Sequence, residues 1–143
     1  MTVKKISHVG IAVPNIEEYI SIYRDTLGLG FLGTEEVPEQ KVKVAFLQIG
    51  ESRIELLEPT ADDSPVQKFL SSNENKPRFH HIAFEVEDLS ASLAKAKADG
   101  LRLIDEEPRL GAGGARIAFI HPKTTAGVLT ELCQHDDHEP VSK

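Results

Sequence analysis

The chain has 143 residues and a mass of 15.7 kDa, and its composition (40% hydrophobic, 27% charged) is that of one globular domain rather than a disordered, collagen-like or coiled-coil chain. No run approaches the roughly 18 apolar residues of a membrane span, and we expect neither a membrane partner nor a signal peptide. Sixteen basic against 23 acidic residues give a net charge of −7, which argues against nucleic acid as a partner. A single cysteine, Cys133, excludes an internal disulfide, so a reducing cytoplasmic location is expected.

The two halves of the sequence repeat one pattern. Residues 7–16 align with residues 80–89, and each segment is followed by a helix-like stretch that ends at a Gly-Leu pair. Farther on, residues 53–57 resemble residues 129–133. We therefore predict a single domain, 1–143, built from two modules at about 5–60 and 78–134, with a short helical linker at 61–77.

The first module begins with a strand at residues 8–13, where Val9, Ile11 and Val13 alternate with smaller or polar residues. Asn15 and Glu18 form a capping box, which predicts a helix from residue 16 to residue 27. Turn residues then separate three predicted strands, at 30–36, 43–49 and 52–58.

The linker and the second module follow the same logic. Ser64 and Pro65 are a good start for a short helix that reaches Leu70. A strand at 81–86 precedes a helix that begins after Asp88 and ends near Gly100. Three more strands are predicted at 102–106, 116–120 and 128–133, so that each half is βαβββ.

Four possible metal ligands occupy equivalent positions in the two modules. His8 and His81 begin equivalent strands, and Glu55 and Glu131 follow them by 47 and 50 residues. A carboxylate flanked by apolar residues is costly to bury unless a cation pairs with it. If the modules pack about a pseudo-twofold axis, two histidines and two glutamates converge on one site.

Imidazole and carboxylate ligands together suit a borderline divalent ion with room for substrate oxygens. Co²⁺, Mn²⁺, Ni²⁺, Mg²⁺ and Zn²⁺ are all compatible with this set, and a single strand histidine or glutamate would by itself more often be structural. The duplication at matched positions favours a metal site. His80, next to His81, is expected to point to the opposite face because strand side chains alternate.

The repeat, with a histidine at the start of each module and a glutamate in its last strand, resembles the vicinal oxygen chelate superfamily and, within it, the methylmalonyl-CoA epimerases. The resemblance runs along nearly the whole chain. Its matching segments include residues 7–13, 55–59, 63–70, 80–84 and 103–132. The last of these, with its Gly111–Gly114 run, is the most specific.

This resemblance implies an α+β fold in which two paired βαβββ modules form a cupped, eight-stranded mixed sheet around a central metal. It implies the interconversion of (R)- and (S)-methylmalonyl-CoA, a step of propionate metabolism, usually by a homodimer. His8, His81 and Glu131 match the family's metal ligands, and Glu55 occupies the fourth ligand position, where some members have Gln. Val44 stands where some epimerases have a proposed catalytic glutamate, so that role does not carry over.

Epimerisation of the carbon between a carboxylate and a thioester needs a base on each side of that carbon. Glu55 and Glu131, related by the repeat, are the candidate bases, and Glu131 is preferred. An acyl-CoA substrate also needs basic contacts, for which Lys123 beside His121 is a candidate, with a role in solvating the loop as the alternative.

Three other functions stay open at this stage. A glyoxalase I type lactoylglutathione lyase would use similar ligands. An extradiol dioxygenase would use two histidines and one glutamate around Fe²⁺, although Glu55 as a fourth ligand would leave it fewer open positions. A metal-free ligand-binding module of the same fold is the third possibility, and the four intact ligand positions argue against it.

Overall fold

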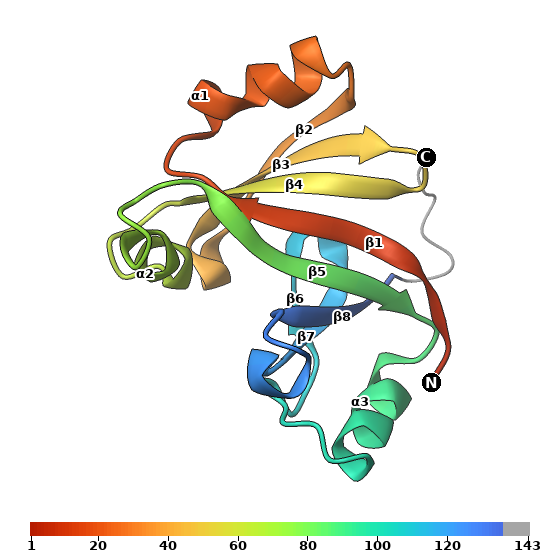
Figure 1. Ribbon diagram of the computed structural model, residues 1–143. Coiled ribbons are helices and arrows are strands. Elements are labelled where there is room, and N and C mark those ends of the chain that lie inside the picture. Colours follow the sequence, from red (N-terminus) through yellow and green to blue (C-terminus); the bar gives the residue numbers. More distant parts are fainter. Residues whose placement is uncertain (136–143) are drawn as a thin grey trace. The chain divides into compact units, whose positions relative to one another are not determined.

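The computed structural model describes residues 1–135. Within this range no helix has the length and apolar character that crossing a membrane requires. The chain divides into two compact units, His8–His81 and Met1–Ser7 together with the residues from Ile82 onward. Hydrogen-bonded neighbours give the strand order β2-β3-β4-β1-β5-β8-β7-β6 (Figure 1).

The unit His8–His81 contains one βαβββ motif. Its elements are the later part of β1 (Val3–Ala12), α1 (Ile16–Ser21), a π-helical turn (Ile22–Thr26), β2 (Gly30–Val37), a 3₁₀ turn (Pro38–Gln40), β3 (Val42–Ile49), β4 (Ser52–Pro59), α2 (Pro65–Ser71) and the start of β5 (Arg78–Val86). β1 runs parallel to β4, whereas β4 with β3 and β3 with β2 are antiparallel. The parallel pair is possible because α1, β2 and β3 lie between β1 and β4 in the sequence.

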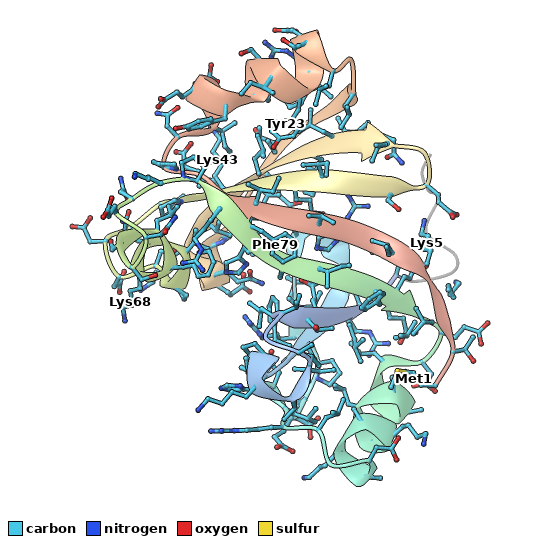
Figure 2. All side chains as sticks on the ribbon, in the orientation of Figure 1. Met1, Lys5, Tyr23, Lys43, Lys68 and Phe79 are labelled. Carbon is cyan, nitrogen blue, oxygen red and sulfur yellow. The ribbon has the colours of Figure 1, made fainter. Side chains whose placement is uncertain are left out.

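The core of this unit lies between α1 and one face of the strands. Its buried members are Val13, Ile16, Ile20, Ala45, Leu47 and Leu56. Tyr23 packs against the same cluster from the π-helical turn (Figure 2). Since Leu56 faces α1, its strand neighbour Glu55 must face the other way.

The second unit repeats the motif. Its elements are the first part of β1, the later part of β5, α3 (Leu89–Ala98), β6 (Arg109–Leu110), a 3₁₀ turn (Ala112–Gly114), β7 (Arg116–Ile120), a second 3₁₀ turn (Pro122–Thr124) and β8 (Thr130–Gln134). α3 packs against one strand face through Leu93 and Ala96, which contact a cluster that includes Ala118 and Leu132. Glu131, next to Leu132 on β8, is therefore on the face away from α3.

The helix starts show the internal repeat in three dimensions. The backbone N–H of Ile16, the first residue of α1, donates to Oε1 of Glu58 at 2.8 Å. The N–H of Leu89, the first residue of α3, donates to Oε1 of Gln134 at 2.7 Å. Glu58 and Gln134 follow Glu55 and Glu131 by three residues each, so the last strand of each module satisfies a free donor at the start of its helix.

The structure confirms an α+β fold of two βαβββ motifs in an eight-stranded mixed sheet. The predicted caps are also present, since Asn15 accepts from the N–H of Glu18 and Asp88 from that of Ala91. The predicted helix 16–27 is α-helical only to Ser21, because Leu27 N–H donates to the carbonyl of Ile22, five residues back.

The prediction of a strand at 102–106 is wrong. Only Leu103 makes an isolated bridge there, to Ile120, and the strand beside β7 is instead β6, at Arg109–Leu110. The N–H of Phe119 donates to Oδ2 of Asp105 at 2.8 Å. A side-chain carboxylate therefore takes a donor that a regular strand would use, and the ladder ends there.

Replacement of Leu56 by alanine tests the core beneath α1. Because Leu56 is fully buried, Leu56→Ala should lower the free energy of unfolding by about 2–5 kcal/mol in denaturant titrations. Leu32→Ala is the control, since Leu32 is 59% exposed and its loss should change stability by no more than about 0.5 kcal/mol. Equal effects of the two variants would contradict this packing.

Candidate metal centre

A polar cluster lies on the strand face opposite α1, within the unit His8–His81. The parallel register places His8 beside Arg53 and Gly10 beside Glu55. Residues two apart in a strand share a face, so these four residues lie on one side of β1 and β4. His81 reaches the same place from β5 and contacts both His8 and Gly10.

The imidazoles of His8 and His81 meet through their Nε2 atoms, which are 3.1 Å apart. The two rings are nearly perpendicular, at 89°, and both side chains are buried. A neutral imidazole carries one ring proton, so two facing Nε2 atoms need a proton or a cation between them. This pair is the arrangement that most directly suggests a metal.

Each of these rings has a polar neighbour at its other nitrogen. His8 Nδ1 lies 3.4 Å from Oε2 of Glu55, and His81 Nδ1 lies 2.8 Å from Nδ1 of His80. Outer partners of this kind fix the orientation and tautomer of metal-bound histidines. Sequence alternation predicts that His80 points to the opposite face from His81, and it gave no indication of this contact between the two rings.

Gly10 provides the space that the His81 ring fills. A Cβ atom at this position would lie 2.5 Å from His81 Nδ1 and 3.1 Å from its Nε2, too close for either atom to stay in place. Gly10 is required here for room and not for a special backbone angle, because its φ is not positive. The absence of a side chain two positions after His8 on this strand therefore has a direct steric reason.

Glu55 is only 2% exposed and is paired with a cation. Arg53 donates to its Oε2 from Nη2 at 2.7 Å and from Nε at 3.2 Å. Sequence reasoning missed Arg53. The available signal was the strand period itself, because a basic residue two positions before a buried glutamate shares its face.

Glu131 lies in the other unit and is 4% exposed. On β8 its register partners are Ala83 of β5 and Phe119 of β7. The face it occupies also carries Cys133, which belongs to a buried apolar cluster with Ile117 and Phe119. A carboxylate in such surroundings is expensive to keep charged without a cation, as the sequence suggested.

The residues present fit a divalent ion. His8 and His81 are buried, and each offers one ligand atom of a type that binds Zn²⁺ or its neighbours. The two Nε2 atoms are 3.1 Å apart, close enough for one ion to bind both. The donor set and the spacing therefore both agree with a metal centre of unspecified identity.

The other predicted site residues have a clear local role. His121 caps the 3₁₀ turn Pro122–Thr124, because its Nδ1 accepts from the N–H of Lys123 at 3.1 Å. Lys123 itself is exposed. Both lie in the unit that contains Glu131, and their contact with substrate stays a prediction.

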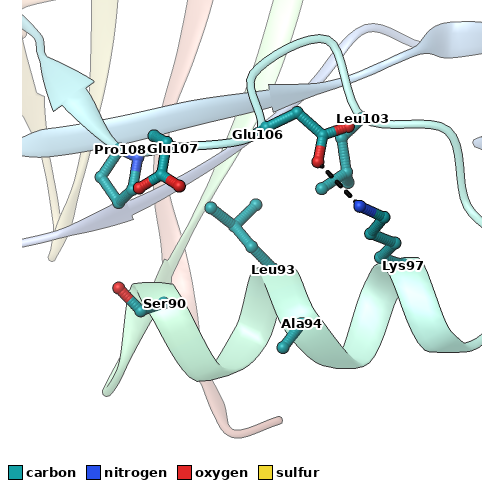
Figure 3. A pocket seen from close by; sticks show the side chains of 8 residues that line it. All are labelled: Ser90, Leu93, Ala94, Lys97, Leu103, Glu106, Glu107 and Pro108. Atoms are coloured by element: carbon teal, nitrogen blue, oxygen red, sulfur yellow. Dashed lines mark hydrogen bonds and ion pairs between the residues drawn. The ribbon is translucent and has the colours of Figure 1, made fainter.

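A separate hollow lies between α3 and the segment before β6 (Figure 3). It encloses about 280 Å³ and includes Leu93, Leu103 and Pro108, with the ion pair of Lys97 and Glu106 (3.0 Å) at its edge. None of the predicted site residues lines it.

Two exposed ion pairs carry carboxylates with shifted pKa values. The hydrogen bond from Arg24 lowers the pKa of Asp25, and the hydrogen bond and charge of Lys41 lower the pKa of Asp63. Both carboxylates are largely exposed to solvent, so these two ion pairs contribute little to stability.

Comparisons with known proteins identify the family. A sequence model of the Glyoxalase/Bleomycin resistance protein/Dioxygenase superfamily matches residues 7–119. An uncharacterized protein of Bacillus subtilis is 47% identical over 140 residues, which cover 94% of this chain and 99% of that protein. The ethylmalonyl-CoA/methylmalonyl-CoA epimerase of Cereibacter sphaeroides is 39% identical over 131 residues, covering 91% and 97% of the two chains.

A solved structure agrees along the same length. A variant of Streptomyces coelicolor methylmalonyl-CoA epimerase, in complex with 2-nitronate-propionyl-CoA, superposes with a TM-score of 0.88 at 40% identity and covers 95% of this chain and 97% of that one. The chain therefore belongs to the Glyoxalase/Bleomycin resistance protein/Dioxygenase superfamily and, within it, to the family that includes the methylmalonyl-CoA epimerases.

Proposed function

We propose that this protein is a metal-dependent methylmalonyl-CoA epimerase that interconverts the (R) and (S) forms by removing and returning the α-proton. The observation that carries the proposal is the pair of buried Nε2 atoms 3.1 Å apart, in a chain whose relatives include named epimerases. A divalent ion bound there supplies positive charge beside the substrate oxygens on which negative charge develops as the proton leaves.

His8, His81 and Glu131 are the proposed ligands, with Glu55 as a fourth. Strand geometry supports the first three: His81 and Ala83 are two residues apart on β5 and share a face, and Ala83 is the register partner of Glu131. The carboxylate of Glu131 is therefore expected on the same strand face as the His81 ring. Of Glu55, Oε2 is held by Arg53, which leaves Oε1 as the oxygen for a fourth ligand position.

Glu131 and Glu55 are also the proposed bases, one for each face of the α-carbon, and each alternates between the roles of metal ligand and base. One carboxylate takes the proton from the carbon as the C–H bond breaks, and the electron pair moves into the enolate. The other returns a proton to the opposite face, so that the stereocentre is inverted and no proton is gained or lost overall. Glu131 is the preferred base, and Val44 supplies none because its side chain cannot accept a proton.

The acyl-CoA part of the substrate needs cationic contacts on a chain with a net charge of −7. We propose Lys123, which is exposed beside the cap formed by His121, as one of them. A homodimer and a cytoplasmic location are the further parts of this proposal, the second supported by a single buried cysteine.

The lyase and the metal-free module are not favoured. The Cereibacter sphaeroides relative and the Streptomyces coelicolor structure are both named epimerases, and each match covers more than 90% of this chain. Two buried imidazoles with facing Nε2 atoms also favour a metal centre over a metal-free module.

Replacement of Glu131 by glutamine tests its role as a base. Because an amide cannot accept the proton, Glu131→Gln should slow loss of the α-proton of methylmalonyl-CoA in D₂O by about 10²–10⁴-fold, as followed by NMR. Bound metal is measured in the same samples, so that loss of the base is separated from loss of a ligand. Glu36→Gln, at an exposed position on β2, is the control, and a metal-loaded Glu131→Gln that keeps exchange near the wild-type rate would contradict the assignment.

Removal of metal tests the reaction class. Protein treated with EDTA and desalted should no longer exchange the α-proton of methylmalonyl-CoA in D₂O, and addition of Co²⁺ or Zn²⁺ should restore exchange. Elemental analysis verifies that the treated protein is metal-free. Undiminished exchange by that protein would contradict a metal-dependent mechanism.

A methyl group at Gly10 tests the geometry of the two histidines. Gly10→Ala should displace the His81 ring and weaken Co²⁺ binding, measured by calorimetry, by more than about tenfold. Gly30→Ala is the matched control, because a Cβ at Gly30 would make only an ordinary 3.8 Å contact with Gln48. Similar affinities for the two variants would show that Gly10 is not needed to seat His81.

A further inference from the structure

The carboxylate of Glu55 is held by one oxygen. Both Arg53 bonds, from Nη2 at 2.7 Å and from Nε at 3.2 Å, go to Oε2. The same oxygen lies 3.4 Å from Nδ1 of His8. Arg53 and His8, which lie on the same strand face as Glu55, therefore both contact its oxygen Oε2. The Glu55 side chain is almost completely shielded from solvent.

Arg53 is itself confined. Its guanidinium lies over the ring of Phe46, 5.6 Å from the ring centre, and its side chain is only 21% exposed. In the strand register, Phe46 of β3 lies opposite Glu55 of β4, and His8 of β1 lies opposite Arg53 of β4. The donors of an arginine guanidinium form a rigid planar fork, so a guanidinium held in this position over Phe46 fixes where Oε2 of Glu55 can lie.

We propose that Arg53 is a positioning residue that acts on His8 through Glu55. By holding Oε2 next to His8 Nδ1, Arg53 keeps the ring proton of His8 on Nδ1 and leaves Nε2 unprotonated and directed toward His81. The inference rests on the proposed function, because it gives His8 Nε2 the part of a metal ligand. It adds a residue that touches neither substrate nor metal.

The tautomer of His8 is the first readout, and it needs neither metal nor substrate. In metal-free, ¹⁵N-labelled protein, long-range ¹H–¹⁵N spectra should show His8 protonated at Nδ1, with its signals assigned by their loss in His8→Gln. Arg53→Gln should move His8 toward the Nε2-protonated form. Arg24→Gln, which breaks the exposed pair with Asp25, should leave the spectrum unchanged.

Metal affinity is the second readout. Arg53→Gln should weaken Co²⁺ binding about 10–100-fold, as expected for an outer partner of a ligand histidine. Glu55→Gln should also weaken it, and the double variant should be no weaker than Glu55→Gln alone, because Arg53 acts only through Glu55. Arg53→Lys retains the positive charge but lacks the planar guanidinium, so its Co²⁺ affinity should lie between those of the wild type and Arg53→Gln. Thermal melts verify that each variant folds.

Specific outcomes overturn the inference. An unchanged His8 tautomer in a folded Arg53→Gln variant would do so, as would losses of affinity that multiply in the double variant. A wild-type protein that binds no divalent metal but shows the tautomer shift would refute the proposed metal centre and leave the role of Arg53 intact. If Arg53→Gln does not fold, the same spectra are recorded for Arg53→Lys. An unchanged His8 tautomer in Arg53→Lys would then contradict the proposal that the Arg53 guanidinium sets this tautomer.

Discussion

The burial of polar side chains on the strand face opposite α1 is the constraint on which the rest of this site depends. Imidazole nitrogens and carboxylate oxygens removed from water each need a partner, and the unit His8–His81 supplies one for each: Nε2 faces Nε2, His8 Nδ1 faces Glu55, and Glu55 faces Arg53. Gly10 is part of the same constraint, since only the absence of a side chain at this position lets the His81 ring approach His8. On the opposite face of the same strands, the apolar residues that pack against α1 supply stability that offsets the cost of burying these polar groups.

The two motifs use their faces in the same way. In each, the helix covers one side of the strands with aliphatic residues, and the last strand turns a glutamate to the other side and a capping oxygen to the start of the helix. Gene duplication is the simplest account of this pairing. The differences are equally informative: the partner of Glu55 is Arg53, whereas the position two residues before Glu131 is Leu129. The repeat thus preserves the positions of the proposed ligands but not the residues that support them.

Much of the fold was predictable because local signals agreed with long-range ones. The capping box at Asn15 and the alternation around His8 and His81 specify their elements without help from the rest of the chain. The strand predicted at 102–106 failed because a side chain, Asp105, competes with the backbone for a hydrogen bond, and residue periodicity contains no information about that competition. The contact between the His80 and His81 rings was not foreseen, since alternation describes where a side chain leaves the strand and not where a long ring ends. The role of Arg53 depends on register between β1 and β4, which a single sequence does not specify.

The division of β1 between the two units has a consequence for how the chain is made. Met1–Ser7 belong with the residues from Ile82 onward, and Lys4 pairs with Glu85 at 3.4 Å, whereas His8–His81 form the other unit by themselves. On the ribosome, the residues made first therefore wait for partners made more than seventy residues later, while the stretch that begins at His8 can already close. Such long sequence separations slow folding and leave a strand exposed in the meantime. The charged residues Lys4 and Lys5 in that waiting segment are well suited to keep it from pairing with another chain.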